Sequence, residues 1–440
     1  MAAPGKHGAA AGLSRRGLAA YAAFALPLAM AALPVYVHAP KFYAELGLNL
    51  TLIGALLLAV RTLDALIDPL LGFVADRVSR RLVMALATPL IALGMVLLFN
   101  PPAGAGMLAG WFAGALILVY LGLSAATISY FAAGSALSRD YHERTLITAV
   151  RGMASLTGVL AAAALPEYLA ALFGRETGLS WFSIGFVPLL VVAAVATLVW
   201  TPAPAVSPVM RRARFELRSV LQPFANARYR RLAAVFLVNG IAAAIPATLI
   251  LFFVADIIQA VEYTGLFLVV YFLSGAAGMP LWVRWSRVIG KTRTWAIAMA
   301  LSVVAFVWAF ALGAGDVVAF AVVCALSGLA FGADLALPAS LLADVIDRDE
   351  RAGGGRPDGA YFGMWHLLEK LALAIAAGTA LPLLDALGYQ PGATGGATAL
   401  AATYALLPCA IKLAAAWLLW RSALEPQRGV APLRTKEEST

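Results

Sequence analysis

Two carboxylates and an arginine stand inside a long apolar stretch of this sequence. Arg61, Asp64 and Asp68 occur within residues 57–69, where most other side chains are apolar. Spacings of three and four residues place all three on one face of a helix. A charge at mid-bilayer costs about 2.5–3.5 kcal/mol on insertion scales, so each of these charged residues is expected to have a structural or functional role. The two carboxylates can hold a cation or a proton. An Arg61–Asp64 ion pair alone would leave Asp68 without a counter-charge.

A lysine lies near the middle of another apolar stretch, residues 360–384. Lys370 follows His366 by four residues and so shares its helix face, whereas Glu369 shares a face with Trp365. A lysine at a helix end can snorkel toward the membrane surface, but the central position of Lys370 argues against this. We therefore expect Lys370, with the neighbouring Trp365, to face a polar site between helices rather than lipid.

Three further charged residues lie in or beside apolar stretches. Asp334 is about ten residues from the end of the stretch 317–343 and is predicted to be intramembrane. Lys412 is nearer the end of its stretch, which favours snorkelling or packing. Arg151 opens the stretch 149–173, so it is either a flanking charge or part of a site.

Composition indicates the elements that must carry these residues. Of 440 residues, 62% are hydrophobic and 12% are charged, whereas soluble domains carry roughly a quarter of charged residues. The apolar runs have the length of a membrane-spanning helix and show no two-residue alternation, so we predict an all-α membrane protein. Twelve spans are predicted, at about 17–39, 48–75, 82–100, 107–136, 149–173, 181–200, 232–257, 264–285, 294–313, 317–343, 360–384 and 399–421.

Other functions of the polar residues are disfavoured. Cys324 and Cys409 lie in separate apolar runs and the four histidines are scattered, so we expect no disulfide framework, no metal site and no cofactor. The net charge of +9 is explained by membrane topology, and no nucleic-acid partner is expected.

Basic residues alternate between the two sides of the predicted spans. One side collects Arg15, Arg16, Arg77, Arg80, Arg81, Arg139, Arg144, Arg284, Arg287, Lys291, Arg293, Arg348, Arg351 and Arg356. The other offers only Lys41 and Arg175. Because positive loops stay cytoplasmic, both termini are predicted to lie in the cytoplasm. The protein is expected in the cell (inner) membrane, with an uncleaved first span.

The longest connector, residues 201–231, divides the chain into six spans and six. Residues 1–200 and 232–421 form the two predicted six-helix halves, and residues 422–440 form a cytoplasmic tail. Two such halves with a long cytoplasmic link are the plan of the major facilitator fold. A loop after the second span supports this: Gly72, Asp76 and Arg77 are followed by Arg80 and Arg81, as in the major facilitator signature, with Ser79 in place of its second glycine.

Taken together, these residues resemble the glycoside–pentoside–hexuronide:cation symporter family. The resemblance is strongest at residues 61–72, at residues 140–144 with Arg151, and from residue 335 through Asp344 and Asp347 to Lys370. It implies that Asp64 and Asp68 bind the coupling cation, that Arg61 stands beside them, and that Arg151 and Lys370 border the solute cavity. It also implies a cytoplasmic gate, to which we assign Asp76, Arg77, Asp344, Asp347 and Arg356.

The sequence departs from the sugar-recognition pattern of that family. There is no Asp or Glu before Glu45 and none between Asp76 and Asp140, and Ile67 replaces a common asparagine. The fourth span instead offers Thr127, Ser129 and Tyr130. Of these we assign Thr127 to the cation site and Tyr130 to the solute site. Arg61 and, from the other half, Asp334 and Trp365 are also assigned to the solute site.

We therefore expect a monomeric symporter that works by alternating access and is not an enzyme. Its expected solute is a sugar, a glycoside or a related small molecule. The alternatives are a lysolipid carrier of the same fold and, from another class, a polytopic membrane enzyme, for which no nucleophile, base or metal cluster is seen. Two adjacent acids in an apolar setting disfavour double ionisation, so a proton is preferred to sodium as coupling ion. The Thr127 hydroxyl and backbone carbonyls could complete a sodium shell.

Overall fold

A computed structural model describes residues 14–102, 105–135, 137, 141–201, 221–351, 358–393, 395–422 and 424. Within these residues the regular structure is helical, and twelve helices are long and apolar enough to cross a membrane. The prediction of a twelve-span all-α membrane protein is confirmed. Most of the predicted linker and tail lies outside the described residues.

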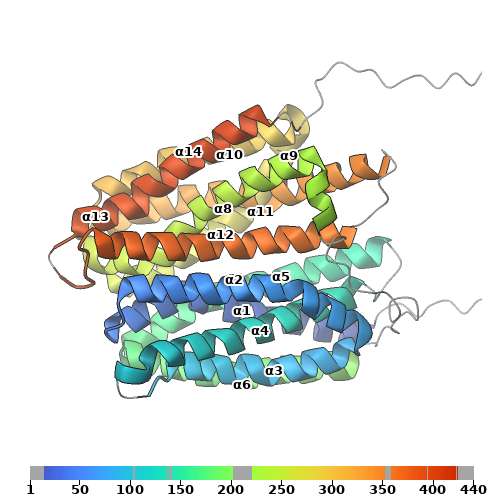
Figure 1. Ribbon diagram of the computed structural model, residues 1–440, viewed down its shortest axis with the longest axis horizontal. Helices are drawn as coiled ribbons and strands as arrows, with labels where there is room; N and C mark the ends of the chain where they lie inside the picture. The colour runs from blue at the N-terminus through green and yellow to red at the C-terminus, as the bar shows by residue number, and fades with distance from the viewer. Residues whose placement is uncertain are drawn as a thin grey trace, which may run out of the picture.

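The first six membrane helices form what we call the N-terminal helix group. Its members are α1 (Arg15–Glu45), α2 (Leu50–Arg77), α3 (Arg80–Phe99), α4 (Leu108–Ser135), α5 (Tyr141–Phe173) and α6 (Arg175–Trp200). In Figure 1 these blue-to-green helices lie together along one side of the molecule.

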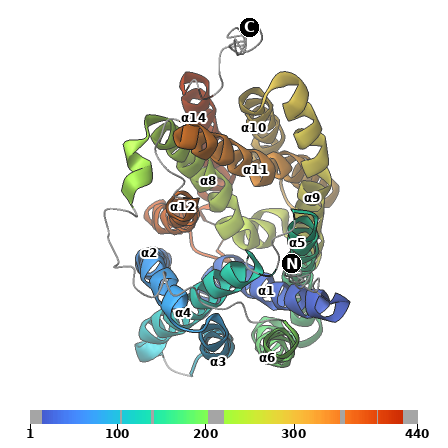
Figure 2. The same ribbon diagram turned by 90° about the vertical axis from the view of Figure 1, so that its right-hand side faces the viewer.

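The remaining helices form the C-terminal helix group. Its members are α8 (Ala227–Phe253), α9 (Thr264–Ile289), α10 (Lys291–Val307), α11 (Val317–Arg351), α12 (Asp358–Ala386), α13 (Ala397–Ala401) and α14 (Leu407–Arg421). A π-helical turn at Val254–Ile258 extends α8, and another at Ala402–Leu406 joins α13 to α14. Viewed along the helices, α2 lies beside α12 and α5 beside α9, so these pairs link the two groups (Figure 2).

The α2–α12 seam depends on two glycines. A Cβ at Gly54 would come within 2.8 Å of the Pro382 ring, and one at Gly378 within 2.7 Å of Leu58. Small residues let membrane helices approach closely, and here they bring α2 and α12 together beside the predicted site.

Hydrogen bonds also join the groups at the end of the molecule that is predicted to face outward. The buried Lys41 of α1 donates to the Leu251 carbonyl of α8 over 2.8 Å. Asn49 and Thr51 donate to the Asp385 carboxylate at the end of α12, over 3.0 and 2.5 Å. Polar contacts therefore join the two helix groups at this end of the interface.

Several predicted boundaries differ from the structure, and the start of the sixth span has an identifiable physical cause. The sixth span begins at Arg175, six residues before the predicted start at residue 181, after Gly174 turns the chain with φ 82°. Arg175 lies 3.4 Å from Glu45 and 3.5 Å from Glu167. Because its charge is neutralised, this arginine can open a membrane helix.

Candidate functional site

Two acids of α2 and a lysine of α12 meet at the seam between the helix groups. Lys370 Nζ lies 2.9 Å from Asp64 Oδ2 and 2.5 Å from Asp68 Oδ2. Asp64 and Asp68 are one helical turn apart, so both carboxylates reach the same ammonium. The side chains of Asp64, Asp68 and Lys370 are only 5%, 16% and 18% exposed.

A serine of α4 completes this group, which we call the Lys370 cluster: Asp64, Asp68, Ser124 and Lys370. Ser124 Oγ donates to Asp64 Oδ1 over 2.6 Å and accepts from Lys370 Nζ over 2.6 Å. The sequence analysis selected Thr127 as the hydroxyl of the fourth span. In the described part of the chain no hydrogen bond joins Thr127 to the cluster, and Ser124, one turn earlier on α4, occupies that place. The sequence feature that could have identified Ser124 is its spacing of three residues from Thr127, which puts the two hydroxyls on neighbouring positions of one helix face.

The charges in direct contact within the Lys370 cluster do not balance. Two carboxylates face one ammonium, which leaves one negative charge when both acids are ionised. Asp68 Oδ1 is buried and has no hydrogen-bond partner among the described residues. Buried polar atoms are nearly always paired, so this oxygen is an open position for a proton or a cation.

Arg61 does not supply the missing charge by direct contact. Its guanidinium lies over the Tyr120 ring, 4.6 Å from the centroid, and its buried Nε has no hydrogen-bond partner among the described residues. Within the described part, no ion pair links Arg61 to Asp64 or Asp68. The alternative of a self-neutralising Arg61–Asp64 pair is therefore not what the structure contains.

Two of the predicted solute residues lie inside the N-terminal helix group. Tyr130 is fully buried, stacks on Tyr21 at 4.4 Å and donates to the Tyr21 carbonyl over 2.8 Å. Arg151 lies over the Phe131 ring at 4.3 Å. These contacts belong to the packing of α1, α4 and α5, and they are separate from the Lys370 cluster.

Asp334 stands in a second polar group, which we call the Lys412 cluster: Asp334, Lys412, Asn239 and Trp295. Lys412 Nζ lies 3.1 Å from Asp334 Oδ2. Asn239 Nδ2 and Trp295 Nε1 donate to Asp334 Oδ1 over 3.0 and 2.7 Å. Of the two interpretations of Lys412, packing fits the structure and snorkelling does not, because the side chain is 7% exposed and ion-paired within the C-terminal helix group. Asp334, which the sequence analysis assigned to the solute site, has no direct contact with the Lys370 cluster among the described residues.

Trp365 packs against its neighbours within the C-terminal helix group. It is buried and stacks on Phe236 of α8 with 3.7 Å between ring centroids. Its neighbours His366 and Glu369 pair with each other over 3.0 Å, on the exposed part of α12.

Part of the predicted gate lies within the described residues. Asp344 of α11 pairs with Lys291 of α10 over 2.6 Å, so it fastens two helices of the same group. Asp347 is half-buried on the same helix. Asp76 and Arg77 end α2, but their side chains, and all of Arg356, lie outside the described residues.

The described residues contain no group of three or more His, Cys, Asp or Glu side chains that could hold a metal ion. The chemistry of the Lys370 cluster is instead that of two carboxylates, a hydroxyl and an ammonium within hydrogen-bond distance. Such a group can take up or release one positive charge.

Comparison with known sequences gives two matches. The family model described as MFS/sugar transport protein matches residues 18–425. The "uncharacterized symporter YnaJ" of Bacillus subtilis (strain 168) is 33% identical over 158 residues, which are 32% of each chain. The chain thus spans about a third of the length of that curated relative in this match.

Comparison with solved structures supports the same architecture. The crystal structure of a mutant of the nucleoside transporter NupG superposes with a TM-score of 0.69 and 15% identity, covering 92% of this chain and 99% of that one. A bacterial homologue of the human lysosomal transporter Spinster, inward-facing and unoccupied, gives 0.65 and 14%, covering 93% and 95%. At these identities the likeness concerns the fold alone.

Proposed function

We propose that this chain, which belongs to the MFS/sugar transport protein family, couples movement of a sugar, a glycoside or a related small solute to a proton gradient by alternating access. Family membership makes the chain a membrane-embedded transporter of the sugar/solute class and not an enzyme, as the sequence predicted. The coupling ion and the solute are the parts that we propose.

The observation that carries the proposal is the surplus carboxylate of the Lys370 cluster. Asp64 and Asp68 share one ammonium, and Asp68 Oδ1 has no described partner. An uncompensated buried charge is costly, so uptake of one positive charge at Asp68 stabilises the cluster. A coupling site needs this property.

A proton fits this position better than sodium. The Lys370 ammonium already occupies the space between the carboxylates and Ser124, with three oxygens within 2.9 Å. A proton on Asp68 neutralises the surplus without displacing the ammonium. A metal cation requires several oxygen ligands and would have to replace the lysine.

The position of the cluster explains how a proton would act on conformation. Its acids belong to the N-terminal helix group and its lysine to the C-terminal group, so the ion pairs cross the seam that alternating access must rearrange. Protonation of Asp68 weakens one of these ion pairs and thereby changes the relative stability of the two conformations.

We also propose the orientation and the assembly. Both termini face the cytoplasm from a cell (inner) membrane, because basic residues gather at that end. The Lys370 cluster is complete within one chain, which supports a monomeric unit. Cysteines placed in the turn at residues 313–316 should react with an impermeant reagent from outside, and reaction from inside only would contradict this orientation.

Gradient-driven uptake tests the coupling ion. A thermal-shift screen of the purified protein against sugars, glycosides, hexuronates and lysolipids first selects the solute, and a response to lysolipids alone would favour the amphiphile-carrier alternative. Proteoliposomes are then given an imposed proton gradient or an imposed sodium gradient. We expect accumulation with the proton gradient only.

An acid variant identifies the coupling residue. Asp68→Asn should abolish proton-driven accumulation, whereas Glu369→Gln, a carboxylate of α12 outside the cluster, should leave it unchanged. Sodium-driven accumulation by the unmodified protein would contradict the proton assignment. Undiminished proton-driven uptake by Asp68→Asn would remove Asp68 from the coupling site.

A further inference from the structure

A cavity lies inside the C-terminal helix group and is separate from the Lys370 cluster. About 770 Å³ of space within it is not occupied by protein atoms, including space that is open to solvent. Side chains from α8, α9, α10, α11 and α14 line it, with Tyr404 from the turn before α14 and Val37 from α1. None of the Lys370 cluster residues contributes to its walls.

Most of the cavity wall is apolar and aromatic. Tyr271, Phe272, Phe306, Phe331 and Tyr404 surround it, together with aliphatic residues of α8. The hydroxyl of Ser327 is satisfied by the Val323 carbonyl of its own helix, over 2.6 Å. The wall near Ser327 and Cys324 therefore offers a ligand mainly apolar contact.

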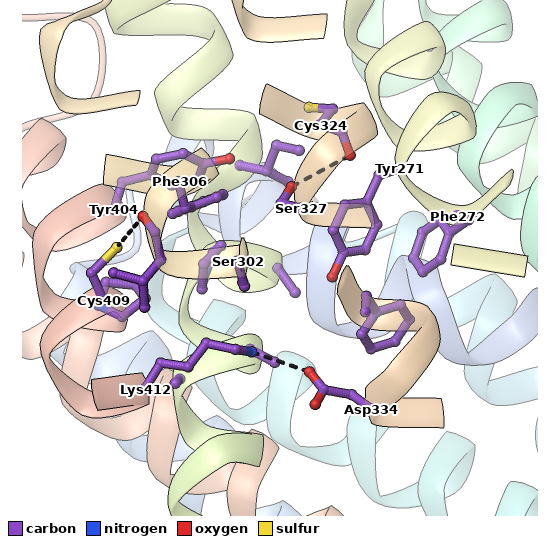
Figure 3. Close-up of a pocket in the computed structure, with 18 of the residues that line it drawn as sticks. Tyr271, Phe272, Ser302, Phe306, Cys324, Ser327, Asp334, Tyr404, Cys409 and Lys412 are labelled. Atoms are coloured by element: carbon purple, nitrogen blue, oxygen red, sulfur yellow. Dashed lines mark hydrogen bonds and ion pairs between the residues drawn. The ribbon is translucent and has the colours of Figure 1, made fainter. Parts of the chain in front are cut away.

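The opposite edge of the cavity is polar. Figure 3 shows Lys412 and Asp334 reaching toward each other there, across from Cys324 and Ser327. Asp334 Oδ1 is taken by Asn239 and Trp295, and Oδ2 faces Lys412. The carboxylate is thus held on both oxygens.

Lys412 has donor capacity to spare. An ammonium carries three donors, and the described residues supply Lys412 with one acceptor, Asp334 Oδ2. The hydroxyls of Tyr271 and Ser302, which also line the cavity, have no hydrogen-bond partner among the described residues. This edge can therefore receive an oxygen atom from a ligand.

The charge of the edge restricts the ligand. Asp334 and Lys412 balance each other, so a ligand with a net charge would bring an uncompensated charge into an apolar space. We propose that this cavity is a second binding site, which takes an uncharged, largely aromatic or aliphatic molecule bearing a hydroxyl or carbonyl oxygen. The apolar body packs among the aromatic side chains, and its oxygen accepts from Lys412.

Direct binding of 2-naphthol, an uncharged aromatic alcohol, tests the site. Equilibrium dialysis would be done on the full chain in lipid nanodiscs, with empty nanodiscs to measure partitioning into lipid. We expect a saturable component of one molecule per chain on top of the non-saturable partitioning. Absence of a saturable component would overturn the proposal.

Variants locate the bound probe. Ser302→Phe fills the cavity from α10 and should weaken binding by at least about tenfold. Val304→Phe, on the exposed side of the same helix, is the matched control and should bind as the unmodified protein does. Equal binding by both variants would also overturn the proposal.

A double variant tests the polar edge and guards against misfolding of the filled cavity. Asp334→Asn combined with Lys412→Met removes the ion pair without leaving a lone charge, and should weaken binding by about tenfold. Asp68→Asn should not change binding of 2-naphthol, so the test of this second site is independent of the test of proton coupling.

Discussion

The C-terminal helix group contains two buried lysines with different charge balances. Lys370 contacts two carboxylates from the other group, and one oxygen of Asp68 has no described partner. Lys412 contacts one carboxylate from its own group, and both oxygens of Asp334 are occupied. The first cluster has a surplus negative charge and the second has none.

Under the proposed mechanism, a buried charge does not by itself indicate ion coupling. Aspartate and lysine form the ion pairs of both clusters, and intramembrane position argued equally for Asp68 and Asp334. Stoichiometry and location separate them. In the proposed mechanism, the surplus acid at the seam between the helix groups exchanges a proton as the seam opens, whereas the balanced pair moves within one group.

Removal of Lys370 should give the largest effect. Lys370→Ala leaves Asp64 and Asp68 facing each other without a cation, and removes the ion pairs between α12 and α2. We expect complete loss of gradient-driven uptake with normal amounts of protein in the membrane, measured by transport assay and immunoblot. Full uptake by this variant would show that Lys370 only packs. It would contradict the functional difference proposed between the Lys370 and Lys412 clusters.

Removal of Lys412 should act mainly on stability. Lys412→Met leaves Asp334 buried without its counter-charge, which costs about 3–5 kcal/mol, and should lower the melting temperature in a thermal unfolding assay. The double variant with Asp334→Asn should recover most of that loss, because the balanced pair is removed whole. A double variant as unstable as the single one would contradict this account.

Removal of the Ser124 hydroxyl should have the smallest effect. Ser124→Ala deletes hydrogen bonds to Asp64 and Lys370, and such bonds to charged groups contribute about 1.5–3 kcal/mol at most. We expect reduced but measurable proton-driven uptake. Thr127→Ala, one turn further along α4, is the control and should transport normally. A larger loss of uptake in Thr127→Ala than in Ser124→Ala would support the original assignment of Thr127 to the cation site.

Local sequence patterns were enough to predict the membrane helices and the acid face of α2. Apolar length, helical periodicity and the four-residue spacing of Asp64 and Asp68 are local properties, so neither prediction depends on which helices become neighbours. The central place of Lys370 in its span likewise predicted that its side chain is largely buried. The start of α6 escaped prediction because Arg175 is neutralised by acids from other helices.

The pairing of the charged residues, in contrast, depends on how the helices pack. Lys370 and Ser124 are 246 residues apart, and Lys412 and Asp334 are 78 apart, so no local pattern indicates either contact. Tyr130 and Trp365 are of residue types that are common in binding sites. In the structure Tyr130 packs against Tyr21, and Trp365 packs against Phe236. The physical reason is that an intramembrane charge must find a partner, and helix packing, which brings distant faces together, determines the partner that it finds.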